Sequence, residues 1–507
     1  MKLTAVEVDF EKNAVHAGDK HDGGGVLRPS RIFHLLVLST LFWTVVFYVH
    51  SSIQGGAGVV SILPKPSAFS PPVLPGVTGG RRPPDEQPPA EAAAPENSTV
   101  TAPADRCAGR YVYMYDLPPR FNEDIVRECS RLWPWTDWCP YVANWGMGQA
   151  LGDEGDAFSS RGWYDTNQFM LDIIFHGRMR AYECLTNDSS IAAAVFVPFY
   201  AGQEGGRYLY NSTAATRDAL SLDLVEWLAR RPEWRAMGGR DHFLVASRTE
   251  WDYRRYTDDD GEWGNKLLHL PAVRNMTSLL LEATLEESSF AVPYPTYFHP
   301  ETAAQVAAWQ EKVRRSERKW LFAFAGAPRP GSTGTVRAEI IQQCGASSRC
   351  RLFHCGPGGG DCSSPGGVMR VFESSIFCLQ PRGDTLTRRS TFDTILAGCV
   401  PVFFHPGSAY TQYTFFLPKE PKTYSVLIMH TDVSAGNVSI EETLSKIPPE
   451  TVQAMREEVI GLIPRVVYAD PTSRRVDFKD AFDVAVEAVI DRVEKRRRGM
   501  GMATTRG

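Results

Sequence analysis

The chain has 507 residues, of which 43% are apolar and 22% are charged, and its formal net charge is -5. This length exceeds what one compact core accommodates, so two domains with appendages are expected. Nucleic acid is excluded as an expected partner, because the chain is acidic and its clearest basic run, residues 495–498, is short.

Residues 1–106 are predicted to contain no folded domain. Residues 32–49 form an apolar run long enough to cross a bilayer as a transmembrane signal-anchor. Arg28 and Arg31 precede this run, which places residues 1–31 in the cytosol and the rest of the chain in a lumen. A cleaved signal peptide is the alternative, disfavoured by the long polar segment before the run. Residues 50–106 are rich in proline and predict a disordered stem.

Sequons and cysteines support a lumenal location. The ten cysteines all follow the apolar run. The spacing of Cys129 and Cys139, and of the cluster at residues 344–362, fits local disulfides, with a zinc site as the alternative for the cluster. Cys184, Cys378 and Cys399 are interpreted as buried apolar residues. Five N-x-Ser/Thr sequons are candidate glycosylation sites: Asn97, Asn187, Asn211, Asn275 and Asn437.

Strands alternate with helices from residue 110 onward. Strands are predicted at residues 111–115, 192–200, 242–246 and 278–281, with helices at 167–182 and 219–230. This alternation is typical of a parallel α/β sheet. Residues 107–300 are therefore predicted to form an N-terminal Rossmann-like domain, which ends in the proline-rich crossing 293–300.

A second α/β series follows that crossing. A helix at residues 303–318 precedes predicted strands at 320–325, 352–354, 376–379 and 400–404. Residues 301–475 are thus predicted to form a C-terminal Rossmann-like domain. Residues 476–507 are expected to contain a closing helix, 480–493, and a disordered basic tail.

An anion site is predicted where the strand at 376–379 gives way to a helix. Thr387 is the expected N-cap, so that Arg388 and Arg389 fall in the first turn, where the helix dipole disfavours cations. Free backbone N–H groups and two guanidinium groups suit a diphosphate. Asp393, one turn on, could accept from a ribose diol, although an ordinary ion pair between Arg389 and Asp393 is the alternative. The residues of this segment that are expected to bind such a ligand are Arg382, Gly383, Thr385, Arg388, Arg389, Ser390 and Asp393.

A glycine-rich loop after the strand at 320–325 is the second half of this predicted site. Gly326 and Arg329 belong to it, and small residues let backbone N–H groups approach a phosphate. Two strand-to-helix loops at the carboxyl edge of one sheet can bracket one nucleotide diphosphate.

The first domain is rich in aromatic and amide side chains, which suits a carbohydrate. Structural packing is the alternative for residues 133–138 (WPWTDW). The residues expected to bind an acceptor sugar are Trp145, Trp163, Asn167, Gln168 and Tyr200.

Two acidic positions are candidates for a general base. Glu204 lies in an expected loop after the strand that ends at Tyr200, and Asp241 with His242 opens another strand; solvated carboxylates are the alternative. Residues 258–260 (DDD) follow no apolar strand, so they favour a solvated acidic turn over a metal site. Chemistry without a metal or another cofactor is therefore expected.

Long segments of the chain resemble the exostosin-type glycosyltransferases of family 47. They include YVYMYDLPPRFN, NQFMLDIIFHGRMRAYECLTNDSS, AVPYPTYFHP, FCLQPRGDTLTRRSTFD and IPRVVYADP, and the resemblance covers residues 111–470. It is nearest to the plant xyloglucan galactosyltransferases. Two segments depart from the family pattern, QEGGRYLY and the glycine-rich loop 356–367, and the first puts acceptor specificity in doubt.

The resemblance implies a GT-B architecture, inverting transfer from a UDP-sugar, no catalytic metal and a single-pass type II Golgi membrane protein. By position, Asp393 matches the family residue that contacts the ribose, Arg388 and Arg389 match its basic pair, and Arg329 matches an arginine of the first glycine loop. The implied reaction transfers galactose from UDP-galactose to xylose side chains of xyloglucan, and complexes with other Golgi glycosyltransferases are expected.

Two alternatives stay open. The donor could instead be UDP-galacturonate or UDP-arabinose, or the acceptor another matrix polysaccharide. The chain could also be a catalytically silent Golgi scaffold, although the arginine pair, Asp393 and both glycine loops argue against this.

Overall fold

The computed structural model describes residues 105–500, except for 153–157, 159–160, 211, 285–287, 329–333, 356–364 and 474. The described residues all belong to one unit, residues 99–507. The predicted cytosolic tail, the anchor and the stem as far as residue 104 therefore lie outside the described residues. Within the part that is described, no helix is both long and apolar enough to cross a membrane.

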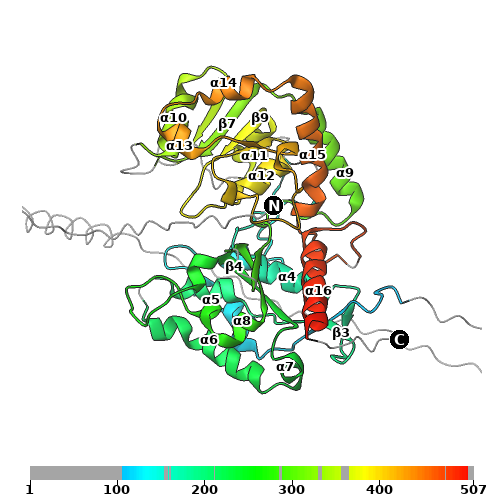
Figure 1. Ribbon diagram of the computed structural model, residues 1–507. Helices are drawn as coiled ribbons and strands as arrows, with labels where there is room; N and C mark the ends of the chain where they lie inside the picture. Colours follow the sequence, from blue (N-terminus) through cyan, green and yellow to red (C-terminus); the bar gives the residue numbers. More distant parts are fainter. Residues whose placement is uncertain are drawn as a thin grey trace, which may run out of the picture. The chain divides into compact units, whose positions relative to one another are not determined.

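The first sheet contains six parallel strands in the order β2-β1-β3-β4-β5-β6. The central strands β3, β4 and β5 are buried along nearly their whole length, as expected for a parallel sheet that helices cover on both faces. The ribbon in Figure 1 shows helices α4 to α8 around this sheet. The strands are β1 (Tyr111–Met114), β2 (Leu185–Thr186), β3 (Ala192–Phe196), β4 (His242–Thr249), β5 (Thr277–Glu282) and β6 (Ser289–Ala291).

The helices of this half match the predicted helical segments in place but not in length. The predicted helix at 167–182 is α4 (Leu171–Arg180), and the one at 219–230 is α6 (Ala214–Ala229), which starts earlier because Thr213 accepts from Thr216 N at 3.2 Å. The others are η1 (Pro119–Phe121), α2 (Glu123–Arg127), η2 (Cys129–Arg131), α3 (Cys139–Val142), α5 (Ala201–Tyr208), α7 (Pro232–Met237), η3 (Glu250–Tyr253), η4 (Leu267–His269) and α8 (Pro271–Asn275).

The second sheet contains five parallel strands in the order β11-β10-β9-β7-β8. The predicted α/β class with parallel sheets is thereby confirmed. The domain boundary predicted at residue 300 falls between β6 and β7. The strands are β7 (Trp320–Gly326), β8 (Cys350–His354), β9 (Ser375–Gln380), β10 (Val400–Phe403) and β11 (Val426–Leu427).

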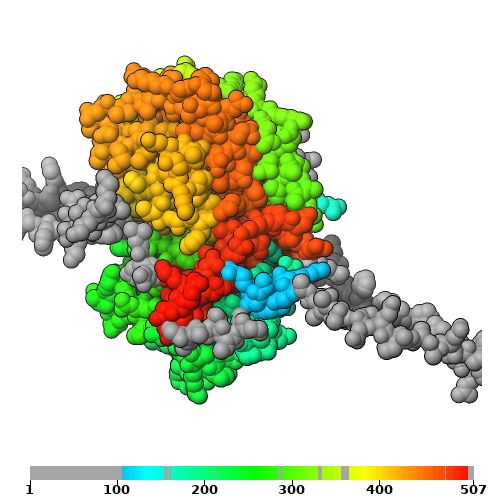
Figure 2. Space-filling model, turned by 45° about the vertical axis from the view of Figure 1, so that its right-hand side comes forward, coloured from blue at the N-terminus to red at the C-terminus, as the bar shows by residue number. Residues whose placement is uncertain are grey.

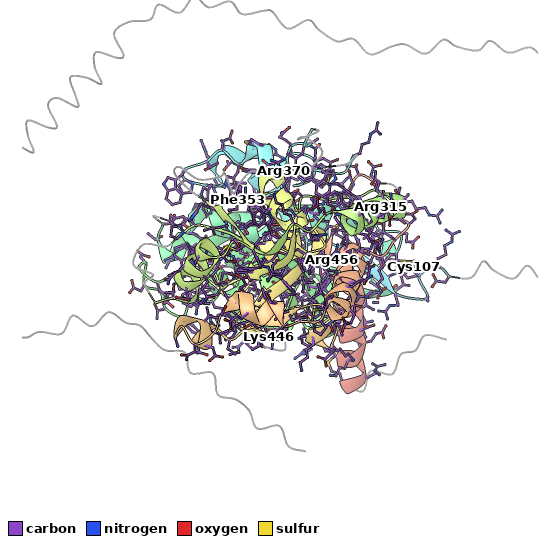
Figure 3. All side chains as sticks on the ribbon, turned by 90° about the horizontal axis from the view of Figure 1, so that it is seen from above. Cys107, Arg315, Phe353, Arg370, Lys446 and Arg456 are labelled. Carbon is purple, nitrogen blue, oxygen red and sulfur yellow. A yellow bond between two sulfur atoms is a disulfide. The ribbon has the colours of Figure 1, made fainter. Side chains whose placement is uncertain are left out.

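Helices α9 and α15 pack against each other beside this sheet. Arg456 of α15, labelled in Figure 3, donates from Nη2 to Val313 O of α9 at 3.3 Å. The helices of this half are α9 (Ala303–Arg315), α10 (Val336–Ala346), α11 (Pro365–Glu373), α12 (Ser390–Leu396), η5 (Pro406–Ser408), η6 (Pro421–Thr423), α13 (His430–Ser434), α14 (Ile440–Ser445) and α15 (Pro449–Val466).

The final helix, α16 (Ala481–Gly499), returns to the first sheet and packs against β3. A capping box starts it, in which Asp480 Oδ1 accepts from Asp483 N at 3.0 Å. Arg110 donates to Asp491 Oδ1 at 2.6 Å and to Glu494 Oε1 at 3.2 Å, so the two ends of the described chain lie side by side, as Figure 2 also shows. The predicted closing helix is present and belongs to the first half, but it is longer than predicted: the basic residues 495–498, expected in a disordered tail, lie at its C-terminal end.

Four disulfides join described cysteines: Cys107–Cys184, Cys129–Cys139, Cys344–Cys350 and Cys378–Cys399. Cys355 is also disulfide-bonded, which argues against a zinc site at this cluster. Cys184, Cys378 and Cys399 are buried, as interpreted, but all three are disulfide-bonded, which was not predicted from the sequence. Cys378 lies on β9 and Cys399 directly precedes the neighbouring strand β10, so their Cα atoms come within 5.9 Å.

Candidate active site at the carboxyl edges of the two sheets

The two loops predicted to hold a nucleotide are neighbours in the second sheet. Strands β7 and β9 pair directly, while β8 lies on the other side of β7, so the strand order reverses at β7. Open α/β sheets bind ligands at such a reversal, outside the carboxyl ends of the strands. Arg337 connects the two loops, since Nη1 donates to Ala327 O at 3.4 Å and Nη2 to Arg382 O at 3.2 Å.

Glycines allow arginine side chains to lie against the backbone here. A Cβ atom at Gly326 would stand 2.5 Å from the Phe324 ring and 3.0 Å from Arg337 Nη1. A Cβ atom at Gly383 would collide with Nη1 of Arg388, so this guanidinium group lies directly over Gly383. A larger residue at position 326 would push against the Phe324 ring and Arg337, and one at position 383 would displace Arg388.

Helix α12 begins later than predicted, and Thr387, which lies before it, is bonded to a distant carboxylate. Thr387 N and Oγ1 donate to Oε2 of Glu282, at the end of β5, over 2.7 and 2.6 Å. Among the described residues no N–H group of α12 donates to the Thr387 hydroxyl oxygen, so Thr387 does not cap the helix. Arg389 takes the N-cap position, so the predictions of Thr387 as N-cap and of both arginines within the first turn were wrong.

Arg389 links α12 to the first half of the molecule. Its guanidinium carbon lies 3.6 Å from the centroid of the Tyr297 ring, and Nη1 donates to Thr166 O. Nε lies 3.4 Å from Oδ2 of Asp393, which is the ion pair weighed as the alternative. Neither Nε nor Nη2 has a hydrogen-bond partner among the described residues. The pair is thus present, but it leaves donors unused.

Asp393 is 4% exposed and keeps one free acceptor. Burial raises the pKa of its carboxyl to about 6, against the opposing attraction of Arg389. Oδ1 has no hydrogen-bond partner within the described part of the chain. A buried oxygen without a partner is costly, and a ligand hydroxyl would satisfy it.

The remaining residues that were predicted to bind the nucleotide-sugar differ in their surroundings. Ser390 donates to Gln380 Oε1 at 2.5 Å, so its hydroxyl hydrogen is used within the protein. Thr385 is half-buried, and its carbonyl accepts from Gly383 N at 2.9 Å. Arg382 is exposed at the sheet edge. Arg329 lies outside the described residues.

Sequence reasoning missed His405 and His430. They follow the neighbouring strands β10 and β11, and their rings stack at 5.7 Å. His405 Nδ1 accepts from Gly407 N at 2.9 Å, which leaves Nε2 as the donor of the neutral ring. Burial, His430 and Arg382 all lower the pKa of His405. Both residues follow a strand at the edge where a ligand is expected, and for His405 that strand was predicted.

Glu204 lies in helix α5 rather than in the loop that we predicted. Strand order reverses in the first sheet between β1 and β3, and α5 begins after β3, so Glu204 is near the expected ligand edge. Burial raises the pKa of Glu204 to about 7, with Arg207 opposing and Glu128 adding to the shift. No hydrogen bond or ion pair to its carboxylate occurs among the described residues, so the group is free to exchange a proton.

Asp241 and His242 are at the wrong edge of the sheet for catalysis. They lie at the amino end of β4, where Asp241 is 3.9 Å from Arg497 Nη2, and this same nitrogen donates to Ala192 O at the start of β3. His242 is fully buried between Asp241, at 2.7 Å, and the Tyr115 hydroxyl, at 2.9 Å. Because ligands bind at the carboxyl edge, this pair is removed from the candidate site.

Two predicted acceptor residues are core residues. Trp163 is 2% exposed and lies among the rings of Phe158, Phe298 and Trp309. Tyr200 is 4% exposed, with its hydroxyl 2.9 Å from His176 Nδ1. Neither ring has a free face for a sugar, so their predicted roles are not supported.

The other residues that were predicted to bind the acceptor sugar are partly accessible to solvent. Trp145 is half-buried under the guanidinium of Arg180, with a centroid distance of 5.2 Å. Asn167 accepts from Phe169 N at 3.0 Å, which shapes a local turn. Gln168 is half-buried. Their roles stay predictions.

The acidic turn at 258–260 uses its carboxylates within the protein. Asp258 pairs with Lys266, Asp259 Oδ1 accepts from Gly261 N at 2.9 Å, and Asp260 Oδ1 accepts from Ala214 N at 2.6 Å. Among the sequons, Asn187 and Asn437 are exposed, whereas Asn275 is half-buried and donates to Gly238 O at 3.0 Å. Asn97 and Asn211 lie outside the described residues.

Comparison with known proteins identifies the family. Residues 106–444 match the Exostosin GT47 domain. The chain is 46% identical over 523 aligned residues to the Arabidopsis thaliana xyloglucan galactosyltransferase MUR3, covering 94% of this chain and 84% of that protein. It is 38% identical to the Arabidopsis thaliana xyloglucan-specific galacturonosyltransferase 1, covering 77% of this chain and 58% of that protein.

A solved glycosyltransferase from Rickettsia africae shares 6% identity and a TM-score of 0.32, covering 63% of this chain and 94% of that one. The family match and the identity to MUR3 each extend over most of the chain. The chain therefore belongs to the exostosin GT47 family.

Proposed function

We propose that the chain transfers galactose, in β linkage and with inversion, from UDP-galactose to xylose side chains of xyloglucan. The observation that carries this proposal is the 46% identity to a xyloglucan galactosyltransferase over 94% of the chain. The chemistry of the two sheets is compatible with this reaction. The carboxyl edge of the second sheet has arginine side chains and a carboxylate oxygen of Asp393 that has no partner among the described residues, and that of the first sheet has the carboxylate of Glu204, whose pKa is about 7.

The two α/β halves form a GT-B arrangement in this proposal. Contacts that join the two edges support it: Glu282 at the end of β5 accepts from Thr387, and Arg389 donates to Thr166 O. The nucleotide-sugar would lie on the second half, against the loops after β7 and β9, and the acceptor on the first half.

UDP would be held by position-specific contacts. Oδ1 of Asp393 would accept from a ribose hydroxyl, since it lacks a partner among the described residues. Arg388 and Arg389, with Arg329, would neutralise the diphosphate as it leaves, so that no metal ion is required. The glycines at 326 and 383 would let the backbone approach the phosphates closely.

Glu204 is the general base in this mechanism. Its pKa of about 7 lets it take a proton at neutral pH. It would remove the proton from the acceptor hydroxyl, the oxygen would form the new bond to the anomeric carbon from the face opposite UDP, and the bond to the diphosphate oxygen would break with its electron pair leaving on UDP. One bond forms, one breaks, and the configuration inverts.

The compartment in the proposal is the Golgi lumen, with residues 32–49 as a type II anchor. Disulfides between described cysteines support an oxidising compartment. The exposed sequons at Asn187 and Asn437 are accessible to the glycosylation that such a route provides.

The test is transfer onto xyloglucan oligosaccharides by the full-length chain in detergent, with linkage analysis of the product. Arg389→Ala and Asp393→Ala each remove a charged contact to UDP, so each is expected to lower kcat/KM by about 10- to 150-fold. Undiminished transfer in both variants would refute the donor site.

A galacturonate donor is the second candidate, because the galacturonosyltransferase relative shares 38% identity. Competition between UDP-galactose and UDP-galacturonate in one reaction decides between them, since the preferred donor dominates the product. Calorimetric titration with UDP addresses the scaffold alternative, which requires that UDP does not bind.

A further inference from the structure

Five aromatic residues form a connected group on the first half, which we name the tryptophan rim: Trp133, Trp135, Trp138, Tyr210 and Trp263. Trp133 stacks on Trp138 with centroids 5.2 Å apart and planes 16° apart. Tyr210 contacts Trp135 at 4.7 Å and Trp263 at 5.3 Å, both edge to face. Trp133 and Trp135 are 6.0 Å apart, which closes the group.

The rim is held rigidly. The Cys129–Cys139 disulfide closes the loop that carries its three tryptophans at 133, 135 and 138. The guanidinium group of Arg248, on β4, lies 5.3 Å from the Trp133 ring. Trp263 Nε1 donates to Asp252 Oδ1 at 2.7 Å, which fixes the orientation of that indole. A rigid aromatic surface loses little entropy when it binds a ligand.

One member of the rim is turned to solvent. Trp135 is 66% exposed, although its ring continues the packed group. A single exposed aromatic residue is ordinary, but an exposed indole supported from behind by other rings presents a flat apolar face. Such a face fits the C–H face of a pyranose ring, whose hydroxyl groups remain in water.

The rim is linked to the helix that carries the candidate base. Arg207 of α5 forms an ion pair with Glu128, next to the disulfide-closed loop. The same helix carries Glu204, whose titration Glu128 influences. An acceptor chain whose reacting sugar is at Glu204 would therefore extend toward the rim.

We propose that the tryptophan rim is a binding subsite for the acceptor polysaccharide, which stacks a pyranose ring other than the reacting one on Trp135. This inference rests on the proposed function, because it takes a polysaccharide as the acceptor. It adds that affinity depends on acceptor length, since a short oligosaccharide fills the reacting position without covering Trp135.

The test compares Trp135→Ala with Trp251→Ala. Trp251 is equally exposed, at 66%, but makes no ring contact among the described residues, so it controls for the loss of any surface indole. We measure KM for the shortest acceptor and for a long one, and take their ratio. In Trp135→Ala the KM for the long acceptor should rise about tenfold relative to the short one, the size expected from one lost aromatic contact. In Trp251→Ala the ratio should equal that of the wild type, and Trp135→Phe should restore part of the effect.

Binding to immobilised xyloglucan, measured without donor, separates this inference from the proposed function. Weaker binding by Trp135→Ala supports the rim even if the wild type transfers no galactose. An unchanged ratio in Trp135→Ala, or an equal change in Trp251→Ala, would overturn it. The inference would also be overturned if the rim joined two copies of the chain. In that case Trp135→Ala would convert a dimer to a monomer and leave acceptor binding intact.

Discussion

Replacing Asp393 with asparagine removes a buried charge and keeps the shape of the side chain. The carboxyl is 4% exposed, and its pKa is raised from 3.8 to about 6, a value that already includes the attraction of Arg389. The carboxyl group of Asp393 therefore binds its proton more tightly in the folded protein than in the unfolded chain. A difference of this size corresponds to about 3 kcal/mol.

This difference in pKa sets the direction in which the stability of the protein changes with pH. Ionisation of Asp393 costs stability: the cost is absent below about pH 4, grows between about pH 4 and 6, and is fully present above about pH 6. Asparagine does not titrate. The free energy of unfolding of Asp393→Asn should therefore exceed that of the wild type at pH 7.5, by up to about 3 kcal/mol, and the advantage should shrink toward pH 4. Urea denaturation across this pH range measures it.

The same substitution should weaken the binding of UDP. A hydrogen bond to a charged acceptor contributes about 1.5 to 3 kcal/mol, so the Kd for UDP should rise about 10- to 150-fold. Calorimetric titration of the two proteins at pH 7.5 checks this value. Lower stability of Asp393→Asn at pH 7.5 would refute the burial argument, and an unchanged Kd would refute the ribose contact.

Three further substitutions test other parts of the site. Glu204→Gln should lower kcat by about 10²- to 10⁴-fold. The wild-type rate should rise through about pH 7, where Glu204 loses its proton, and this rise should be absent in the variant. A rise that persists in Glu204→Gln would show that another base acts. Glu282→Ala deletes both hydrogen bonds to Thr387, so it should raise the KM for the donor about tenfold while the KM for the acceptor stays constant. A donor affinity equal to that of the wild type would contradict the role of Glu282 in holding the loop. Trp163→Ala should cost about 3 to 5 kcal/mol in unfolding experiments, whereas Trp163→Phe should keep the acceptor KM; a raised KM in the phenylalanine variant would return Trp163 to the acceptor site.

Most of the sheet architecture could be predicted because buried parallel strands are nearly continuous apolar runs. All eight predicted strands correspond to strands of the structure, within a few residues at each end. The strands that escaped prediction, β2, β6 and β11, have two or three residues and lie at or next to a sheet edge. Segments this short carry no periodic pattern.

The errors at the site have two physical causes. The N-cap prediction at Thr387 failed because Glu282, 105 residues earlier in the chain, accepts from both the N–H and the hydroxyl of Thr387 and holds this residue outside α12. Sequence spacing does not reveal such a distant partner. The prediction of Asp241 failed for a different reason, since it precedes its strand whereas Glu204 follows one. Strand direction was readable from the sequence and separates the two edges of a parallel sheet.

Disulfide pairing was the least predictable feature. Cys378 and Cys399 are flanked by apolar residues, which resembles a buried free thiol. Only the pairing of β9 with β10 brings them together. Local spacing was sufficient for Cys129 and Cys139, which are ten residues apart.

The return of α16 to the first sheet has a consequence for how the protein is made. Arg178 of α4 donates to Asp480 Oδ2 at 3.1 Å, and nine side chains of α16 are buried, so the first half lacks part of its interior until the final helix leaves the ribosome. The second half, from α9 to α15, is continuous in sequence. We expect it to acquire protease resistance first during synthesis, reversing the usual order from the N-terminus. Chains stalled after α15 should show a resistant second half and a digestible first half; resistance of both would refute this order.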